Sequence, residues 1–358
     1  MIRSLLCLLL LAPTLAAQTV KLGGYIQLDG RWIADDRDED ASTFLIRRAR
    51  PIVSGKLTDT IGYRLMADFG NGRVSLEDAW VEARVAPRLT IRGGKFKVPF
   101  GQERLQSAVD LPFAERSLAN NLAPNRDVGF MLSTGTRFTL DAGLFNGAPD
   151  GASVDLDSDT GKDAAARVTT ELLPKRLRVA LAATYGDSSG AAAVSYRTPA
   201  QETFFTYLGG TTGDGARVRF SPQVAYAAGS LYASAEAIVS RQDLRRAANA
   251  ISATNRAWQV TGRWVSGGTI DLAGKVTPSA GGAWELVARA GDLEVDDDLF
   301  TGFADPATAA RAARSYGAGV NWYPSAPLKL MLDVERTSFD GSGRGDETFV
   351  GMRMQVAF

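Results

Sequence analysis

The sequence contains no histidine among its 358 residues. This absence excludes Ser-His-Asp and Cys-His catalysis, H-E-x-x-H zinc sites and proton relays that depend on imidazole. An enzyme in a membrane barrel would still need an activated nucleophile, and without histidine we find no base that could activate one. We therefore expect no catalytic residue, no metal site and no cofactor.

Cysteine is almost absent as well. The one cysteine, Cys7, lies inside an apolar run near the N-terminus. Residues 1–17 have the pattern of a secretory signal peptide, with Arg3 before the apolar run Leu5 to Leu11 and small residues from Pro13 to Ala17. A short buried helix is the alternative. We expect export of a mature chain, residues 18–358, that has no cysteine and so avoids stray disulfides in an oxidising compartment.

Two further absences concern hydrophobic runs and net charge. Beyond the N-terminus no apolar run approaches the roughly 20 residues that a membrane-spanning helix needs. Forty basic and forty acidic residues cancel, so the overall charge does not indicate nucleic acid or any other charged partner.

The pattern that is present has a period of two. From Val350 to Phe358, five apolar side chains alternate with Gly351, Arg353, Gln355 and Ala357. A strand with one apolar and one polar face has this periodicity. A strand of a soluble sheet would fit, but a closed barrel in a membrane requires such a strand, because its last strand must pair with its first.

Comparable segments recur along the whole chain and number sixteen. The predicted strands start at Val20 and continue at 43–56, 61–69, 74–85, 89–98, 128–134, 138–145, 164–172, 177–185, 216–227, 231–240, 257–265, 283–295, 315–323, 328–339 and 347–358. Short connections such as 57–59 and 86–88 alternate with long ones such as 146–163 and 186–215. This arrangement is typical of an all-β transmembrane antiparallel β-barrel. Residues 266–282 are long where a short turn is due, so either this connection is elaborated or the strand count is wrong there.

The alternation is interrupted between Pro99 and Arg126. A structureless loop of this length is uncommon and usually functional or disordered, and its apolar residues argue against disorder. Elsewhere, if the apolar face of each strand meets lipid, the polar face lines a water-filled lumen. Arginine and lysine rings in such a lumen select anions. The candidate pore residues are Arg47, Arg48, Lys95, Lys97, Arg104, Arg116, Arg126, Arg217 and Arg219.

Arg47 and Arg48 are adjacent on one predicted strand and would point to opposite faces of an ideal strand. Either a β-bulge lies here or one of the two faces a neighbouring strand.

Several short motifs, in this order and spacing, resemble the Porin O and P family of phosphate-selective porins from Gram-negative outer membranes. They are Gly24-Tyr25-Ile26-Gln27, Arg47-Arg48-Ala49-Arg50, Gly94-Lys95-Phe96-Lys97-Val98-Pro99-Phe100-Gly101, Phe113-Ala114-Glu115-Arg116-Ser117-Leu118, Arg126-Asp127-Val128-Gly129 and Gly281-Gly282-Ala283-Trp284-Glu285-Leu286. The resemblance extends over nearly the whole mature chain.

The resemblance implies a sixteen-stranded trimeric porin whose third outer loop, here residues 99–126, folds into the lumen and narrows it. In phosphate-selective members, a line of arginines leads anions to a constriction that bears lysine and arginine. Arg47 and Arg48 match the strand motif of the family, whereas Lys95 and Lys97 match as positions only. The neutral overall charge and the carboxylates on lumen-facing positions depart from a strongly anion-selective pattern.

We therefore expect an outer-membrane porin for passive diffusion of small anions, with phosphate or polyphosphate as candidates. The alternatives are a weakly selective general porin and a plugged barrel with a structural or adhesive role. The expected partners are outer-membrane lipid and lipopolysaccharide, two further copies in a homotrimer, and the outer-membrane assembly machinery, which would recognise Val350–Phe358.

Overall fold

The computed structural model describes residues 19–35, 41–156 and 161–358. The predicted signal peptide, residues 1–17, lies outside these ranges. Within the described ranges, no helix is both long and apolar enough to cross a membrane.

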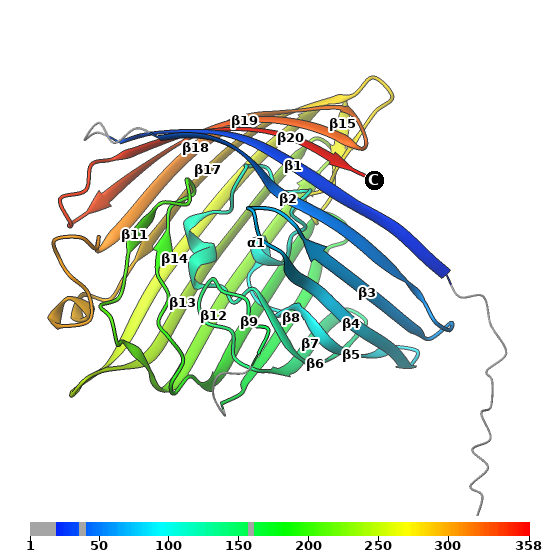
Figure 1. Ribbon diagram of the computed structural model, residues 1–358. Coiled ribbons are helices and arrows are strands. Elements are labelled where there is room, and N and C mark those ends of the chain that lie inside the picture. Colours follow the sequence, from blue (N-terminus) through cyan, green and yellow to red (C-terminus); the bar gives the residue numbers. More distant parts are fainter. Residues whose placement is uncertain (1–18, 36–40, 157–160) are drawn as a thin grey trace, which may run out of the picture.

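Sixteen strands form one closed antiparallel barrel (Figure 1). They are β1 (Thr19–Asp35), β2 (Ala41–Lys56), β3 (Ile61–Asp68), β4 (Ser75–Ala86), β5 (Leu89–Lys97), β6 (Arg126–Gly135), β7 (Phe138–Phe145), β8 (Asp163–Leu173), β9 (Leu177–Asp187), β12 (Thr212–Ala228), β13 (Leu231–Arg246), β14 (Asn249–Ser266), β17 (Ala283–Glu294), β18 (Ala312–Ser325), β19 (Leu328–Asp340) and β20 (Glu347–Ala357). Each corresponds to one predicted strand, so the predicted fold class and strand count are confirmed.

The barrel closes where the last strand meets the first. β20 pairs with β1 along its whole length, from Ala357 opposite Tyr25 to Glu347 opposite Asp35. Beyond the end of β20, Phe358 and Gly24 exchange two backbone hydrogen bonds of 2.8 and 3.0 Å. Closure satisfies the backbone groups of both strands and leaves no exposed edge, as a barrel in lipid requires.

Side chains of opposite character alternate along the strands as predicted. On β19 and β20, Leu332 and Met352 point outward and are about half exposed. Lys329, Asp333 and Arg353 occupy the other parity and are buried inside the barrel. The apolar face of each strand therefore forms the outer surface, and the charged face lines the interior.

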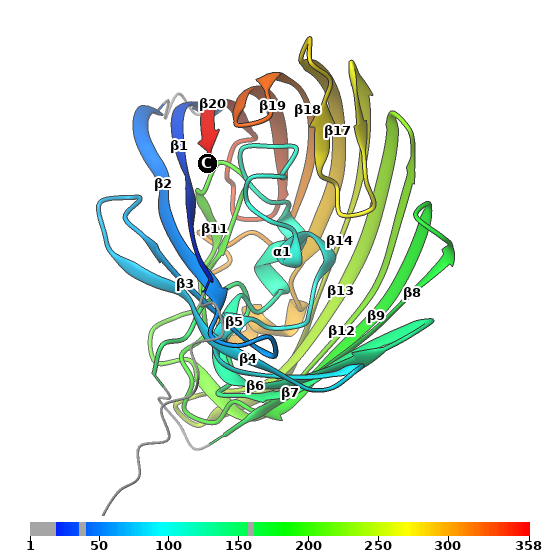
Figure 2. The ribbon, with the colours of Figure 1, turned by 90° about the vertical axis from the view of Figure 1, so that its right-hand side faces the viewer.

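Long connections at one end of the barrel fill part of its interior. The β5–β6 connection, residues 98–125 and here called the inner loop, carries a short helix α1 (Gln102–Leu105) and a 3-10 helix η1 (Leu118–Leu122). Figure 2 shows α1 inside the barrel, which confirms the predicted inward fold of this third outer loop. β10 (Tyr196–Arg197) and β11 (Thr203–Phe205) form a small hairpin, and its aromatic rings pack in the same buried cluster as Leu118 and Leu122. The 3-10 helix η2 (Asp297–Thr301) contributes Leu299 to that cluster.

The irregular connection 266–282 is a hairpin of β15 (Gly268–Ile270) and β16 (Val276–Pro278) that pairs only with itself. It is therefore an elaborated connection, and the sixteen-strand count stands. Ile270 and Val276 pack in a buried cluster with Tyr323 of the barrel wall. At the hairpin tip Gly274 has a φ of +76°, and a Cβ there would come within 2.5 Å of the side chain of Gln106. The hairpin thus reaches the inner loop, and only glycine fits at their contact.

Candidate functional site

A cavity of about 1180 Å³ lies between the inner loop and the barrel wall formed by β1 to β7. Its lining extends from Arg73 and Arg197 at the end with long loops to Asp141 and Phe358 at the end with short turns. The inner loop takes up the opposite side of the lumen. The remaining opening therefore follows one wall along the barrel.

Hydrogen bonds from the far wall fix the position of the inner loop. The carboxylate of Glu236 on β13 accepts the backbone N–H groups of Gln102, at 2.7 Å, and Glu103, at 3.1 Å, where α1 begins. Asp333 on β19 accepts the backbone N–H of Ala114 at 3.1 Å. Backbone groups of an irregular loop need such partners when they are buried. These hydrogen bonds between the wall and the inner loop consequently set the width of the opening.

Basic residues outnumber acidic residues two to one around the cavity, although the chain as a whole is neutral. The twelve basic residues are Lys21, Arg47, Arg48, Arg50, Arg64, Arg73, Arg92, Lys97, Arg104, Arg116, Arg126 and Arg197, and the six acidic residues are Asp68, Glu77, Asp78, Glu115, Asp141 and Asp150. A cleft lined mainly by one sign of charge concentrates ions of the opposite sign. The composition of the whole chain concealed this local excess.

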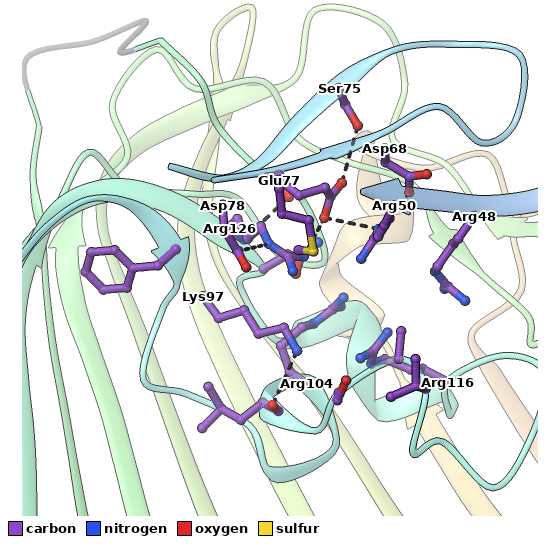
Figure 3. A pocket seen from close by; sticks show the side chains of 18 of the residues that line it. Arg48, Arg50, Asp68, Ser75, Glu77, Asp78, Lys97, Arg104, Arg116 and Arg126 are labelled. Carbon is purple, nitrogen blue, oxygen red and sulfur yellow. Dashed lines mark hydrogen bonds and ion pairs between the residues drawn. The ribbon is translucent and has the colours of Figure 1, made fainter. Parts of the chain in front are cut away.

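Three of these cations, Lys97, Arg104 and Arg116, are here called the cationic cluster (Figure 3). Lys97 and Arg116 both donate to the backbone carbonyl of Gln106, at 2.8 and 2.9 Å, and Arg104 donates to the carbonyl of Asn120. Within the described ranges, none of the three forms an ion pair with a carboxylate.

Burial and mutual repulsion outweigh the attraction of the nearby carboxylate of Glu103 at both Arg104 and Arg116. Burial and the neighbouring guanidinium of Arg116 lower the pKa of Arg104 to about 9. The Nε of Arg104 is buried and has no hydrogen-bond partner among the residues that the structure describes. Burial also lowers the pKa of Arg116, which lies near Arg126. An anion in the opening would relieve this mutual repulsion of the cations.

The wall that faces Arg104 and Arg116 includes β5 with Lys97, and its other cations near the opening are already paired. Arg126 on β6 forms ion pairs with Glu77, at 2.6 Å, and Asp78, at 2.8 Å. Arg50 on β2 pairs with Asp68 at 2.7 Å and with Glu77 at 3.1 Å. In Figure 3 this alternating network faces Arg104 and Arg116 across the opening.

The adjacent arginines of β2 both face the lumen because the strand is irregular between them. Gln27 on β1 is opposite Arg48, but its neighbour Leu28 is opposite Ile46, so Arg47 is the extra residue of a β-bulge. The bulge expected as one alternative is confirmed. Both arginines line the cavity.

The remaining predicted residues do not line this cavity. Lys95 shares a face of β5 with Lys97 but forms an ion pair with Asp155. Arg217 pairs with Asp163 at 3.0 Å, and Arg219 pairs with Asp150 at 2.6 Å, in both cases almost fully buried. These three cations fasten the β7–β8 connection to the wall. Their role as anion contacts stays a prediction.

Sequence reasoning missed several charged residues that the structure places at the cavity, among them Arg50, Glu77 and Glu115. The carboxylate of Glu115 lies 2.5 Å from Arg31 and 2.5 Å from Arg47. Glu115 belongs to the family-like motif Phe113–Leu118, which could have pointed to it. Its partners lie on distant strands, so the sequence did not indicate which residues it would contact.

Residues 20–358 match the family described as phosphate-selective porin O and P. The chain belongs to the porin O and P family. As a member, this porin is an outer-membrane channel rather than an enzyme, and its short turns lie at the periplasmic end. No curated protein matches it.

Solved structures of other outer-membrane proteins share the fold of this porin. The outer-membrane channel DcaP of Acinetobacter baumannii is 14% identical, with 96% of this chain and 99% of that chain covered and a TM-score of 0.67. An anion-selective porin from Comamonas acidovorans is 13% identical, with 96% and 100% covered and a TM-score of 0.63. OmpT of Vibrio cholerae, in a trimer form, is 12% identical, with 96% and 100% covered and a TM-score of 0.56.

Proposed function

We propose that this porin is an anion-selective channel whose constriction lies between Arg104 and Arg116 of the inner loop and the wall of β2 to β6, which carries Lys97. The observation that carries the proposal is that Lys97, Arg104 and Arg116 lie at the opening and form no ion pair with any carboxylate of the described residues. Paired cations such as Arg126 present little net field, whereas unpaired ones attract an anion directly.

Passage needs no reaction step. Ammonium and guanidinium groups replace part of the hydration shell of an anion as it enters the opening, and several sites in series keep each binding step weak enough for release. The planar fork of arginine fits two oxygens of a phosphate or carboxylate at once. These groups therefore favour oxyanions over chloride, and phosphate is the substrate that the family description suggests.

A weakly selective general porin is the second candidate, and the carboxylates of the wall favour it. Glu77, Asp78 and Asp68 all line the cavity and give cations a favourable path beside the cluster. Current through single channels in planar bilayers, with chloride as carrier and inorganic phosphate added, separates the two. A specific anion channel is blocked by phosphate at low concentration, and a general pore is not.

A plugged structural or adhesive barrel would have no stable open conductance. The cavity whose lining reaches both ends of the barrel supports a channel instead. The same bilayer recordings test this alternative, since a plugged barrel gives no steps of current.

The proposal extends to the assembly and surroundings of this porin. A homotrimer in outer-membrane lipid and lipopolysaccharide agrees with the family and with the trimer form of the Vibrio cholerae protein. Recognition of Val350–Phe358 by the assembly machinery agrees with the alternating pattern of β20, which exposes apolar side chains on one face. Cross-linking of the purified protein tests the trimer.

A further inference from the structure

One carboxylate of the inner loop sits among four guanidinium groups. Glu115 Oε1 lies 2.5 Å from Arg31 Nη2 on β1 and 2.5 Å from Arg47 Nε on β2. Its Oε2 accepts from Arg47 Nη2 at 3.1 Å and lies 3.7 Å from Arg48 Nη2. Arg353 on β20 is 3.6 Å away. These arginines come from three strands on either side of the seam where the barrel closes.

Positive charge remains in excess at this site even with Glu115 in place. The one other carboxylate paired with these arginines, among the described residues, is Asp29, which contacts Arg31 at 2.8 Å and Arg353 at 2.6 Å. Four guanidinium groups therefore face two carboxylates. Removing the charge of Glu115 would leave an excess of three buried positive charges, an arrangement that strongly favours capture of another anion.

Glu115 stays charged under ordinary conditions. Against the cost of burial, the guanidinium groups of Arg47, Arg48 and Arg31 hold its pKa well below the usual range. Its side chain is only 3% exposed, yet it lines the cavity together with Arg47 and Arg48, and the next residue, Arg116, belongs to the cationic cluster. The carboxylate thus borders the path of permeating ions.

The arrangement of donors around this carboxylate is that of an oxyanion site. Arg47 donates to both oxygens as a fork, and Oε1 also accepts from Arg31, as the oxygens of phosphate or of an organic acid would. A site of this kind on the path, if empty, would hold a permeating oxyanion tightly and slow its release. A conducting channel needs binding weak enough for the ion to leave.

We propose that Glu115 is a resident counter-anion, which fills a four-arginine oxyanion site at the channel wall and thereby sets how weakly the channel binds permeating anions. This role rests on the proposed anion selectivity and makes Glu115 a specificity-determining residue. The cationic cluster remains open for the permeating ion because the stronger neighbouring site is already occupied.

The test is E115Q, which keeps the size of the side chain and removes its charge. Single-channel chloride currents are recorded in planar bilayers while inorganic phosphate is added. We expect the phosphate concentration for half block to fall at least about tenfold, since one favourable charge-assisted contact contributes roughly 1.5 kcal/mol or more. The control is E171Q, the same substitution at a carboxylate that pairs with an arginine, Arg178 at 3.3 Å, but lies outside the cavity lining, so its half-block concentration should stay near that of the wild type.

Different failures identify different errors. Unchanged or weaker phosphate block in an E115Q protein that assembles normally would overturn the counter-anion role. Larger, noisier currents without stronger block would also overturn it, because they would mean that Glu115 only anchors the inner loop. A wild-type channel that passes cations in preference to anions would refute the proposed function itself.

Two further variants keep the proposal testable if E115Q does not assemble. The double variant E115Q/R48Q restores the balance of charge, and its phosphate block should return toward the wild-type value. E115A leaves room for a small carboxylate, so its refolding yield should be higher in sodium acetate than in sodium chloride at equal ionic strength. Equal yields in the two salts would contradict an oxyanion site.

Discussion

Replacing Lys97 by glutamine removes one of three unpaired cations at the opening and leaves the strand unchanged. Lys95 lies two residues earlier on the same face of β5, but Asp155 neutralises it. The pair therefore offers matched variants, K97Q and K95Q, that remove the same charge from one strand. Only the first is expected to change ion selectivity.

The size of the effect follows from Coulomb's law. A monovalent anion about 5 Å from the ammonium gains roughly 0.8 kcal/mol in water. Screening at 0.1 M salt reduces this gain to about 0.5 kcal/mol. A cation loses as much as an anion gains, so the difference between them is about 1 kcal/mol, which changes the anion-to-cation permeability ratio about fivefold.

The assay is the zero-current potential across a planar bilayer with a tenfold gradient of potassium chloride. We expect K97Q to move this potential toward that of a cation-selective channel and K95Q to leave it near the wild-type value. Equal shifts in the two variants would refute the assignment of the constriction, as would the absence of any shift in K97Q. Both variants should first show normal amounts of assembled barrel.

Three other predictions concern the wall, the seam and the inward hairpin. E77Q removes the carboxylate that bridges Arg50 and Arg126 and should increase anion selectivity. The increase should be smaller than the decrease caused by K97Q, because Asp68 and Asp78 still pair with the two arginines. The zero-current potential measures the change, and a shift toward cation selectivity would contradict this prediction. Deleting Phe358 removes two backbone hydrogen bonds at the seam, each worth about 1 kcal/mol, and should lower the yield of folded barrel in gel-mobility assays while the conductance of assembled channels stays the same. Deleting residues 268–278 removes the hairpin that fills the lumen beside the inner loop and should raise single-channel conductance. An unchanged conductance would mean that ions do not pass this side of the lumen in the wild type or in the deletion variant.

The strands could be predicted from the sequence because their signal is local. Alternation at a period of two identifies a strand and its lipid-facing side without knowledge of its neighbours. The last strand, ending at Phe358, illustrates this, since its pairing with β1 follows from the need to leave no edge in lipid. The inner loop was recognisable for the opposite reason, because the alternation fails from Pro99 to Arg126.

The state of each charged side chain could not be predicted, because it depends on residues far away in the sequence. Lys95 and Lys97 have the same parity and are two residues apart, yet Asp155 pairs with the first, whereas the second donates to backbone carbonyls and has no carboxylate partner in the part of the chain that the structure describes. Glu115 meets arginines of β1, β2 and β20 only after the barrel has closed. Local periodicity carries no information about such partners.

We propose that cations without a carboxylate partner among the described residues, gathered at one constriction, make a chain without net charge into an anion channel. The most direct test is the zero-current potential of the wild-type porin in a planar bilayer with a gradient of potassium chloride. We expect the zero-current potential to have the sign that results when chloride carries most of the current. A potential of the opposite sign, or one close to zero, would contradict it.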